Sequence, residues 1–215
     1  MKSLKFIVGT LAVLTAPAAL AGVVVTSGTV LNDTGIFGYS AFRLNNQSGL
    51  SSTYVSGVTD FFTYTSANPT HTGSSGSNGF LANVGVSVDF DLGATYLLSD
   101  LALWNDIDFQ GVNSFTVRIA NNAAFADATS LGSYNATYGS LVGSSAIGAQ
   151  LFDLTDGTGR YVRVTFNSIH GANPYVNVGE LAFGVQDGNT VPEPGSLALA
   201  GLSLAGLALS RRKKR

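Results

Sequence analysis

The sequence predicts an all-β protein, a β-sandwich or jelly roll, with a processing segment at each end of the chain. Apolar and polar residues alternate in several short runs, and turns rich in Gly, Asn and Asp separate those runs. Helical periodicity is scarce. About eight short strands divided by such turns are typical of a sandwich or jelly roll rather than of a protein with alternating strands and helices.

Four runs of alternation carry this prediction, at 84–92, 115–119, 162–166 and 181–185. A period of two places the apolar side chains of each run on one face, which can pack on a common core. Further strands are predicted from weaker patterns at 41–44, 55–64, 96–104 and 150–154, and residues 121–128 favour one or two helical turns. The Gly- and Ser-rich run 72–79 is predicted to be a loop.

Residues 22–190 are predicted to form one domain that is acidic and free of lysine. Four arginines stand against eleven aspartates and one glutamate, a net charge of −8. Nucleic-acid binding depends on Lys and Arg side chains that neutralise phosphates, so we expect no nucleic-acid partner. The chain has no cysteine, which excludes disulfides, zinc–thiolate sites and iron–sulfur clusters.

Residues 1–21 are predicted to be a signal peptide. Two lysines give a positive start, an apolar stretch too short to span a bilayer follows, and Ala19 and Ala21 form an A-x-A cleavage site before Gly22. We therefore expect export by the Sec machinery and cleavage by signal peptidase. A retained N-terminal helix, amphipathic or buried, is the alternative.

Residues 191–215 contain three features in a fixed order: a motif of Pro192, Glu193, Pro194 and Gly195, an uncharged segment, and five basic residues at the end. This arrangement resembles the PEP-CTERM sorting signal. The resemblance implies a hydrophobic sorting helix that an exosortase-type sorting protease recognises, with cleavage near the motif. A permanent tail anchor without processing is the alternative.

The length and charge of that tail fit a transient inner-membrane anchor. As a helix, residues 195–209 would extend about 22 Å, which is shorter than the roughly 30 Å hydrocarbon core. The flanking Arg and Lys side chains can reach the headgroups, and the basic end would stay cytoplasmic by the positive-inside rule. The domain at 22–190 would then lie outside.

Inside that domain four short motifs follow one another: DFDLG at 89–93, LALW at 101–104, RYVRV at 160–164 and ELAF at 180–183. Their order is similar to that of discoidin, or coagulation-factor type C, modules. The resemblance covers about 84–185 and implies a discoidin-like, galactose-binding-like jelly-roll β-sandwich that binds carbohydrate. The family's Asp-Gly and Thr-x-Trp region has no clear counterpart upstream of residue 84.

Possible structural calcium is the one cofactor that the sequence suggests. In related modules early-loop oxygens and the Glu that opens the last strand hold this ion, so the resemblance implies Glu180 and Asp60 as ligands. Separately, Asp106 and Asp108 have a spacing that can present two carboxylates to Ca²⁺ from an extended loop. A solvated turn is the alternative for this pair.

The candidate ligand-binding residues are aromatic. Tyr134, Tyr138 and Tyr175 lie in predicted loops, where they can contact a ligand or cover the sandwich edge. Trp104 could stack on a sugar face, but its place at the end of an apolar strand favours a core position.

No catalytic residues are predicted. His71 and His170 are the only imidazoles, and each is expected to be solvated in a loop without an acid–base partner. Arg160 and Arg163 are three apart in a strand, so they are expected to face opposite sides. At most one can then serve a site, and the other is expected to pair with an aspartate.

These observations favour an exported, non-enzymatic protein of the cell surface or extracellular matrix that binds glycan or exopolysaccharide. A purely structural envelope or biofilm protein without a small-molecule ligand is one alternative. A polysaccharide-active hydrolase is the other.

Overall fold

The computed structural model describes residues 23–72, 78–142 and 146–187. The predicted signal peptide and sorting tail, and most of the predicted loop at 72–79, lie outside this part of the chain. Strands dominate it, which confirms the all-β class. In chain order the elements are β1 Val24–Thr26, β2 Thr29–Val30, η1 Ala41–Leu44, α1 Phe61–Ser66, β3 Thr70–Thr72, β4 Phe80–Asn83, β5 Ser87–Asn105, β6 Val112–Ala120, β7 Thr129–Asn135, β8 Leu141–Val142, β9 Ala146–Gly148, β10 Gln150–Ile169 and β11 Tyr175–Asp187. No helix among these residues is long and apolar enough to cross a bilayer.

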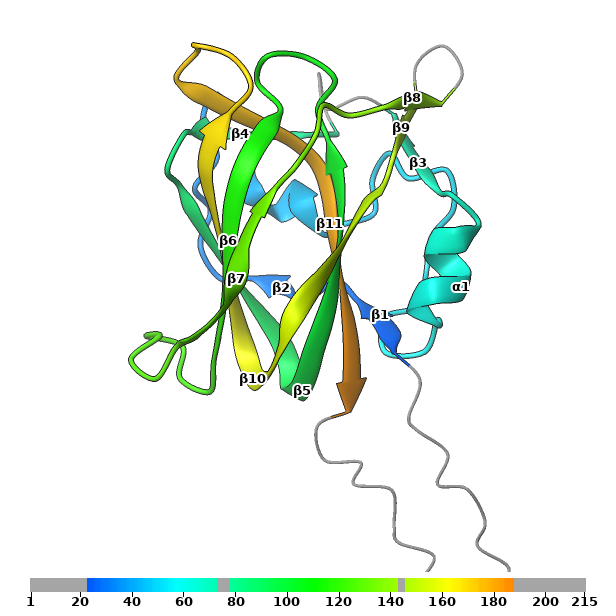
Figure 1. Cartoon of the computed structure of the whole chain (residues 1–215), viewed down its shortest axis with the longest axis vertical. Coiled ribbons are helices and arrows are strands. Elements are labelled where there is room, and N and C mark those ends of the chain that lie inside the picture. Colours follow the sequence, from blue (N-terminus) through cyan, green and yellow to red (C-terminus); the bar gives the residue numbers. More distant parts are fainter. Residues whose placement is uncertain (1–22, 73–77, 143–145, 188–215) are drawn as a thin grey trace, which may run out of the picture. The chain divides into compact units, whose positions relative to one another are not determined.

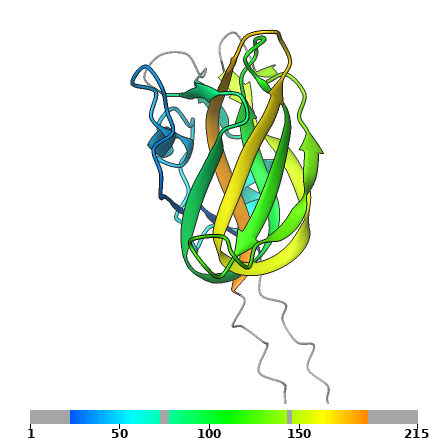
Figure 2. The same ribbon diagram turned by 90° about the vertical axis from the view of Figure 1, so that its left-hand side faces the viewer.

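Eight of the strands form one antiparallel sheet. Its order is β1-β11-β5-β10-β6-β7, with β2 added beside β5 and β4 beside β11. The strands β5 and β10 have 19 and 20 residues and pair with each other along most of their length. Shifts of register near residues 153–157 and 159–161 bend this pair. The sheet therefore curves around an interior, as Figures 1 and 2 show.

The interior is built by the period-two runs of the sequence. The runs at 115–119, 162–166 and 181–185 form strands, and so does the run at 84–92 from residue 87 onward, whereas 84–86 are the turn before β5. Their buried apolar side chains belong to one cluster that includes Phe90, Phe115, Val164 and Phe183. Each fully buried side chain of this size contributes about 1.5–3 kcal/mol relative to an exposed one. Burial of every second side chain therefore stabilises these segments as strands.

Two of the weaker strand predictions are wrong, because capping side chains begin helices there. Residues 41–44 form the 3-10 helix η1, which starts where the Ser40 hydroxyl accepts a hydrogen bond from the Phe42 N–H. Within 55–64, α1 starts where the Asp60 carboxylate accepts the Thr63 N–H at 2.7 Å. Such N-caps satisfy backbone donors that a helix start leaves open. The expected helical turns at 121–128 are turns without a helix.

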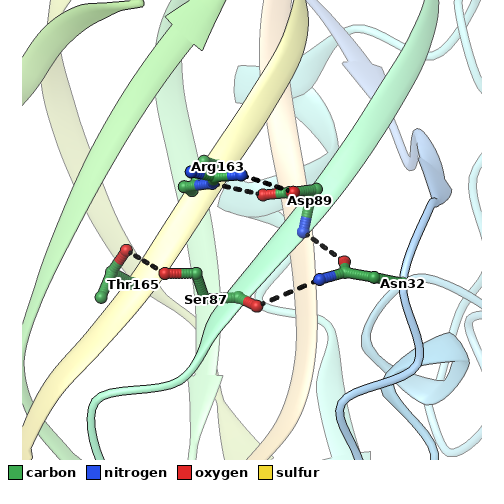
Figure 3. Close-up of polar contacts among 5 residues, drawn as sticks. All are labelled: Asn32, Ser87, Asp89, Arg163 and Thr165. Carbon is green, nitrogen blue, oxygen red and sulfur yellow. Dashed lines mark hydrogen bonds and ion pairs between the residues drawn. The ribbon is translucent and has the colours of Figure 1, made fainter. Parts of the chain in front are cut away.

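The outer face of the sheet carries a network of polar side chains (Figure 3). Arg163 of β10 donates two hydrogen bonds to Asp89 of β5, at 2.6 and 2.8 Å. The Asn32 side chain accepts the Asp89 N–H at 2.9 Å and donates to the Ser87 carbonyl at 3.4 Å. The Ser87 and Thr165 hydroxyls lie 2.8 Å apart. These contacts join the segment before η1 to the middle of the sheet.

A second ion pair corrects the prediction for the two arginines. Arg160 donates two hydrogen bonds to Asp91, at 2.7 and 2.9 Å, and these hold the pKa of Asp91 below its ordinary value. Asp89 and Asp91 are two apart in β5 and share one face, so Arg160 and Arg163 reach the same face. The shift of register next to Gly159 allows this. Both arginines therefore pair with aspartates of β5 on one face of the sheet, and neither faces the opposite side.

Candidate functional site

Three connections meet at the end of the sheet shown at the top of Figure 1. They join β5 to β6, β7 to β8 and β10 to β11, and we call them together the loop end. Backbone hydrogen bonds link them: Gly139 N–H to the Asp106 carbonyl at 2.7 Å, Gly171 N–H to Phe109 at 2.8 Å, and His170 N–H to Gly111 at 3.1 Å. The loop end is thus one connected surface.

Asn105, the last residue of β5, fixes this arrangement from inside. Its side chain is fully buried and donates to the carbonyls of Val112 and Thr137, both at 2.7 Å. Its oxygen accepts the N–H groups of Asp106 at 3.0 Å and Val112 at 2.8 Å. These four bonds use the hydrogen-bonding capacity of a primary amide. One side chain therefore joins β5, β6 and the connection after β7.

Two glycines allow the connections to come this close. A Cβ atom at Gly139 would clash with the Asn105 carbonyl oxygen, and one at Gly171 would lie 2.5 Å from the Phe109 Cβ. Any larger residue would push the connections apart. The connections can therefore approach one another only because positions 139 and 171 are glycine.

The loop end presents aromatic and apolar side chains to solvent. The rings of Tyr138 and His170 are stacked, with centroids 4.1 Å apart and planes inclined by 22°. Tyr138 is 47% exposed, Phe109 51% and Ile107 43%. We call Ile107, Phe109, Tyr138 and His170 the aromatic loop surface. The His170 imidazole packs against one face of the Tyr138 ring and fixes the orientation of that ring in the absence of a ligand.

A second aromatic pair begins on the far side of the 170–174 connection. Tyr175, the first residue of β11, contacts Phe37 edge to face, with centroids 5.8 Å apart. Phe37 is 74% exposed and has a φ of 54°, a backbone conformation that bulky residues rarely adopt. The Asp33 carboxylate fixes its loop by accepting N–H groups from Gly35 and Ala41. Of the predicted tyrosines, Tyr138 and Tyr175 thus lie at or beside the loop end.

Two predicted ligand-binding residues lie elsewhere. Tyr134 belongs to β7, where its ring packs on Phe115 and Phe152 and its hydroxyl donates to the Leu131 carbonyl at 2.6 Å. Trp104 is fully buried, and its indole N–H donates to the Pro69 carbonyl at 2.9 Å. Trp104 belongs to a second buried cluster with Tyr54, Phe61 and Tyr64, which confirms that it fills a core and excludes it as a ligand contact.

The expectation that both histidines are solvated is also wrong. His71 lies in β3 and is fully buried, with its Nε2 atom 2.9 Å from the Ser48 carbonyl. Burial lowers the pKa of His71. His170 is half-buried beneath Tyr138. The two imidazoles therefore occupy packing positions.

Glu180 is the most deeply buried carboxyl group among the described residues. It lies in β11 opposite Trp104, and both of its carboxyl oxygens face the Gln47 N–H, at 3.2 and 3.1 Å. Burial raises the pKa of Glu180 to about 9, and the hydrogen bond from Gln47 offsets only part of this effect. Glu180 is therefore protonated in the folded protein at neutral pH.

The predicted calcium ligands lie in separate places. Asp60 caps α1, whereas Asp106 and Asp108 each accept an N–H group of their own turn, from Ile107 and Gln110, both at 2.7 Å. Within the described ranges no group of three His, Cys, Asp or Glu side chains could hold a metal. The Gln47 N–H also occupies the position between the Glu180 oxygens that a chelated cation would need, and Ca²⁺ takes about six to eight oxygen ligands. These four carboxyl groups therefore do not form one chelating set, and structural calcium stays a prediction.

Comparison with known proteins identifies the C-terminal segment. Residues 190–213 match the family described as the PEP-CTERM protein-sorting motif, which confirms that prediction. The motif implies an exported protein that is anchored in the membrane during transit. A search of curated protein sequences finds no match.

Solved structures with partial similarity include several carbohydrate-binding modules. A truncated AlyQ with CBM32 and alginate lyase domains is 18% identical over 52% of this chain, with a TM-score of 0.42, and the chain spans only 27% of that structure. A GH31 CBM32-2 bound to GalNAc is 11% identical over 77% of this chain and 98% of its own, with a TM-score of 0.45. A chitosan-binding module from the chitosanase/glucanase of Paenibacillus sp. IK-5 is 17% identical over 73% of this chain and 92% of its own, with a TM-score of 0.43. The chain thus carries a PEP-CTERM protein-sorting motif, and CBM32 modules are among its structural neighbours.

Proposed function

We propose that the protein is a non-enzymatic component of the cell surface or extracellular matrix that an exosortase-type system sorts and whose aromatic loop surface binds glycan or exopolysaccharide. The sorting motif at 190–213 supports the export route. The stacked pair of Tyr138 and His170, held on connected loops with Phe109 nearby, is the observation that carries the binding proposal. Binding of a sugar, as in the neighbours named above, is here a hypothesis for this chain.

The chemistry of the aromatic loop surface suits a sugar ring. A pyranose has C–H groups on its faces and hydroxyl groups at its edge, so it packs on an aromatic ring while its edge meets polar atoms. Tyr138 offers the ring, and exposed Asp108 in the neighbouring connection offers carboxylate oxygens. Because the loop end is held by Asn105, little conformational entropy is lost on binding.

Replacing Tyr138 with alanine is expected to weaken glycan binding by at least about tenfold, the equivalent of about 1.4 kcal/mol. The loss follows from removal of the stacking ring. A ligand is first identified on an array of bacterial polysaccharides and simple sugars, and affinities are then measured by calorimetry. Tyr161→Ala, on the outer sheet face, is the matched control and should bind normally. Equal losses in both variants would contradict the assignment, and no binding of wild type at millimolar sugar would favour a purely structural protein.

Processing makes a separate prediction. Mass spectrometry of the mature protein is expected to find an N-terminus at Gly22 and a C-terminus between Pro192 and Gly195. The A-x-A site ends directly before Gly22, and cleavage by the sorting protease is expected near the Pro-Glu-Pro-Gly motif. Glu193→Gln should leave more uncleaved chain, since it changes the motif without changing the hydrophobic segment. A surface form of wild type that keeps residues 211–215 would contradict exosortase-type processing.

A further inference from the structure

An exposed apolar patch lies near the end of the sheet where β11 finishes. Its members are Val55, 62% exposed, Val58, 71% exposed, and Phe62, 49% exposed, and we call them the tail-end patch. Val55 and Val58 belong to one turn, in which the Val58 N–H donates to the Val55 carbonyl at 3.1 Å. Phe62 follows in the first turn of α1, which Asp60 caps. The three side chains are thus carried on a short, hydrogen-bonded segment.

Backbone contacts fix this segment beside the last residues of the domain. The Gly57 N–H donates to the Val25 carbonyl and the Phe61 N–H to the Val23 carbonyl, both at 2.9 Å. Val25 in turn pairs with Gly184 of β11, three residues before that strand ends at Asp187. Figure 1 shows β1 and the end of β11 at the end of the sheet away from the loop end. The tail-end patch therefore lies close to the point where the C-terminal tail begins.

The tail keeps this end of the domain near the membrane during transit. Only eight residues, 188–195, lead from Asp187 to Gly195, where the uncharged segment of the sorting motif begins. An extended chain spans at most about 3.6 Å per residue, so these eight residues reach roughly 29 Å at most. A patch next to the start of so short a tether meets the bilayer surface at a high effective concentration.

We propose that the tail-end patch contacts the lipid surface while the tail anchors the protein. Exposed valine and phenylalanine side chains that gather on one short segment are typical of surfaces that meet a membrane interface or a partner. Residues 55–62 contain no Lys or Arg and only one acidic residue, Asp60. The contact therefore depends on burial of apolar side chains. Because the domain at 22–190 carries a net negative charge, anionic lipids would repel it, and zwitterionic lipid is the favoured surface.

This contact would also orient the protein. The strand β11 has 13 residues and rises about 3.3 Å per residue, so its two ends lie roughly 40 Å apart. A domain that rests on the tail-end patch directs the loop end away from the membrane. The inference depends on the anchoring that the sorting motif implies, and it does not depend on glycan binding at the loop end.

Site-specific labelling tests the contact directly, because the chain has no cysteine. Full-length Ser56→Cys carries one environment-sensitive fluorophore beside an intact patch, and Ser140→Cys carries the same fluorophore at the loop end. Each protein is reconstituted in phosphatidylcholine vesicles with quenchers at headgroup depth, and flotation selects vesicle-bound protein. We expect several-fold stronger quenching at position 56 than at position 140. Addition of Val58→Ser to Ser56→Cys should reduce that quenching, since it removes part of the apolar surface.

Two outcomes would overturn the proposal. Quenching at position 56 no stronger than at position 140, in protein that floats with the vesicles, would show that the patch faces water. A fluorescence shift at position 56 that grows with protein concentration in detergent, without vesicles, would instead assign the patch to a second copy of the chain. Neither outcome bears on the affinity of the loop end for sugar.

Discussion

Glu180→Gln is expected to stabilise the folded protein near pH 8 by about 2–4 kcal/mol and to change its stability little below pH 4.5. The Glu180 carboxyl is fully buried, and the Gln47 N–H is the hydrogen-bond donor found at its oxygens. A glutamine of the same shape can accept that bond with its carbonyl oxygen. It also removes the need to keep a proton on a buried acid.

The direction with pH follows from the raised pKa of Glu180. In the unfolded chain this carboxyl titrates near its ordinary value of 4.5, whereas in the folded protein it titrates at about 9. As pH rises through this window, the unfolded chain releases a proton that the folded protein keeps, so wild type loses stability. The full difference corresponds to at most about 6 kcal/mol above pH 9, and local relaxation reduces it. The gain of the glutamine variant should grow over the same window.

His71 gives wild type the opposite dependence at lower pH. Burial lowers the pKa of His71 in the folded protein. Below about pH 6.5 the unfolded chain therefore binds a proton that the folded protein does not bind, and the stability of the folded protein falls as the solution becomes more acidic. Wild type and Glu180→Gln share this loss. The difference between their urea midpoints, measured across pH, therefore isolates Glu180.

Two controls sharpen the test. Asp60→Asn should act in the opposite direction, because the hydrogen bonds from Thr63 lower the pKa of Asp60 and its contribution to stability is lost as pH falls. Millimolar calcium should leave wild type and Glu180→Gln unchanged, since the Gln47 N–H lies between the Glu180 oxygens. A calcium-dependent rise in the midpoint of wild type alone would show that Glu180 binds calcium and would contradict this account.

The strands could be predicted where the residue pattern and burial agree. The runs at 84–92, 115–119, 162–166 and 181–185 alternate because one face of each is in the core. The sheet of β3, β8 and β9 could not be predicted, since strands of two or three residues are too short to show alternation. The helices η1 and α1 were hidden because single capping side chains outweigh a weak apolar pattern.

The candidate site could be predicted only in part. Tyr138 and Tyr175 were expected in loops, and both lie at or beside the loop end. Phe37 and Phe109 were missed because an exposed aromatic in a turn has no periodicity that distinguishes it from a core residue. Glu180 was found through a motif, but its neutral state follows from burial that no local pattern reveals.

Asn105→Ala is expected to lower the free energy of unfolding by about 3–5 kcal/mol, because an unpaired buried polar group costs about 1–3 kcal/mol. The substitution removes the Asn105 partner of the Asp106 N–H and of both the N–H and the carbonyl of Val112. The Thr137 carbonyl keeps a second donor, the Gln150 side chain at 2.8 Å. Asn105→Asp should be at least as destabilising, since it places a carboxylate against two carbonyl oxygens. Asn121→Ala, in an exposed turn, is the matched control. Urea unfolding measures all three variants.

The same substitution separates a role in the fold from a role in the site. If Asn105 holds the connections together, the folded fraction of Asn105→Ala should exchange the Gly139 amide hydrogen faster, because that amide bonds the Asp106 carbonyl across the loop end. Its glycan affinity should fall as well, although Asn105 is buried and cannot touch a ligand. Unchanged exchange at Gly139 together with a large loss of stability would mean that Asn105 supports the sheet alone. The loop end would then owe its shape to the close approach at Gly139 and Gly171.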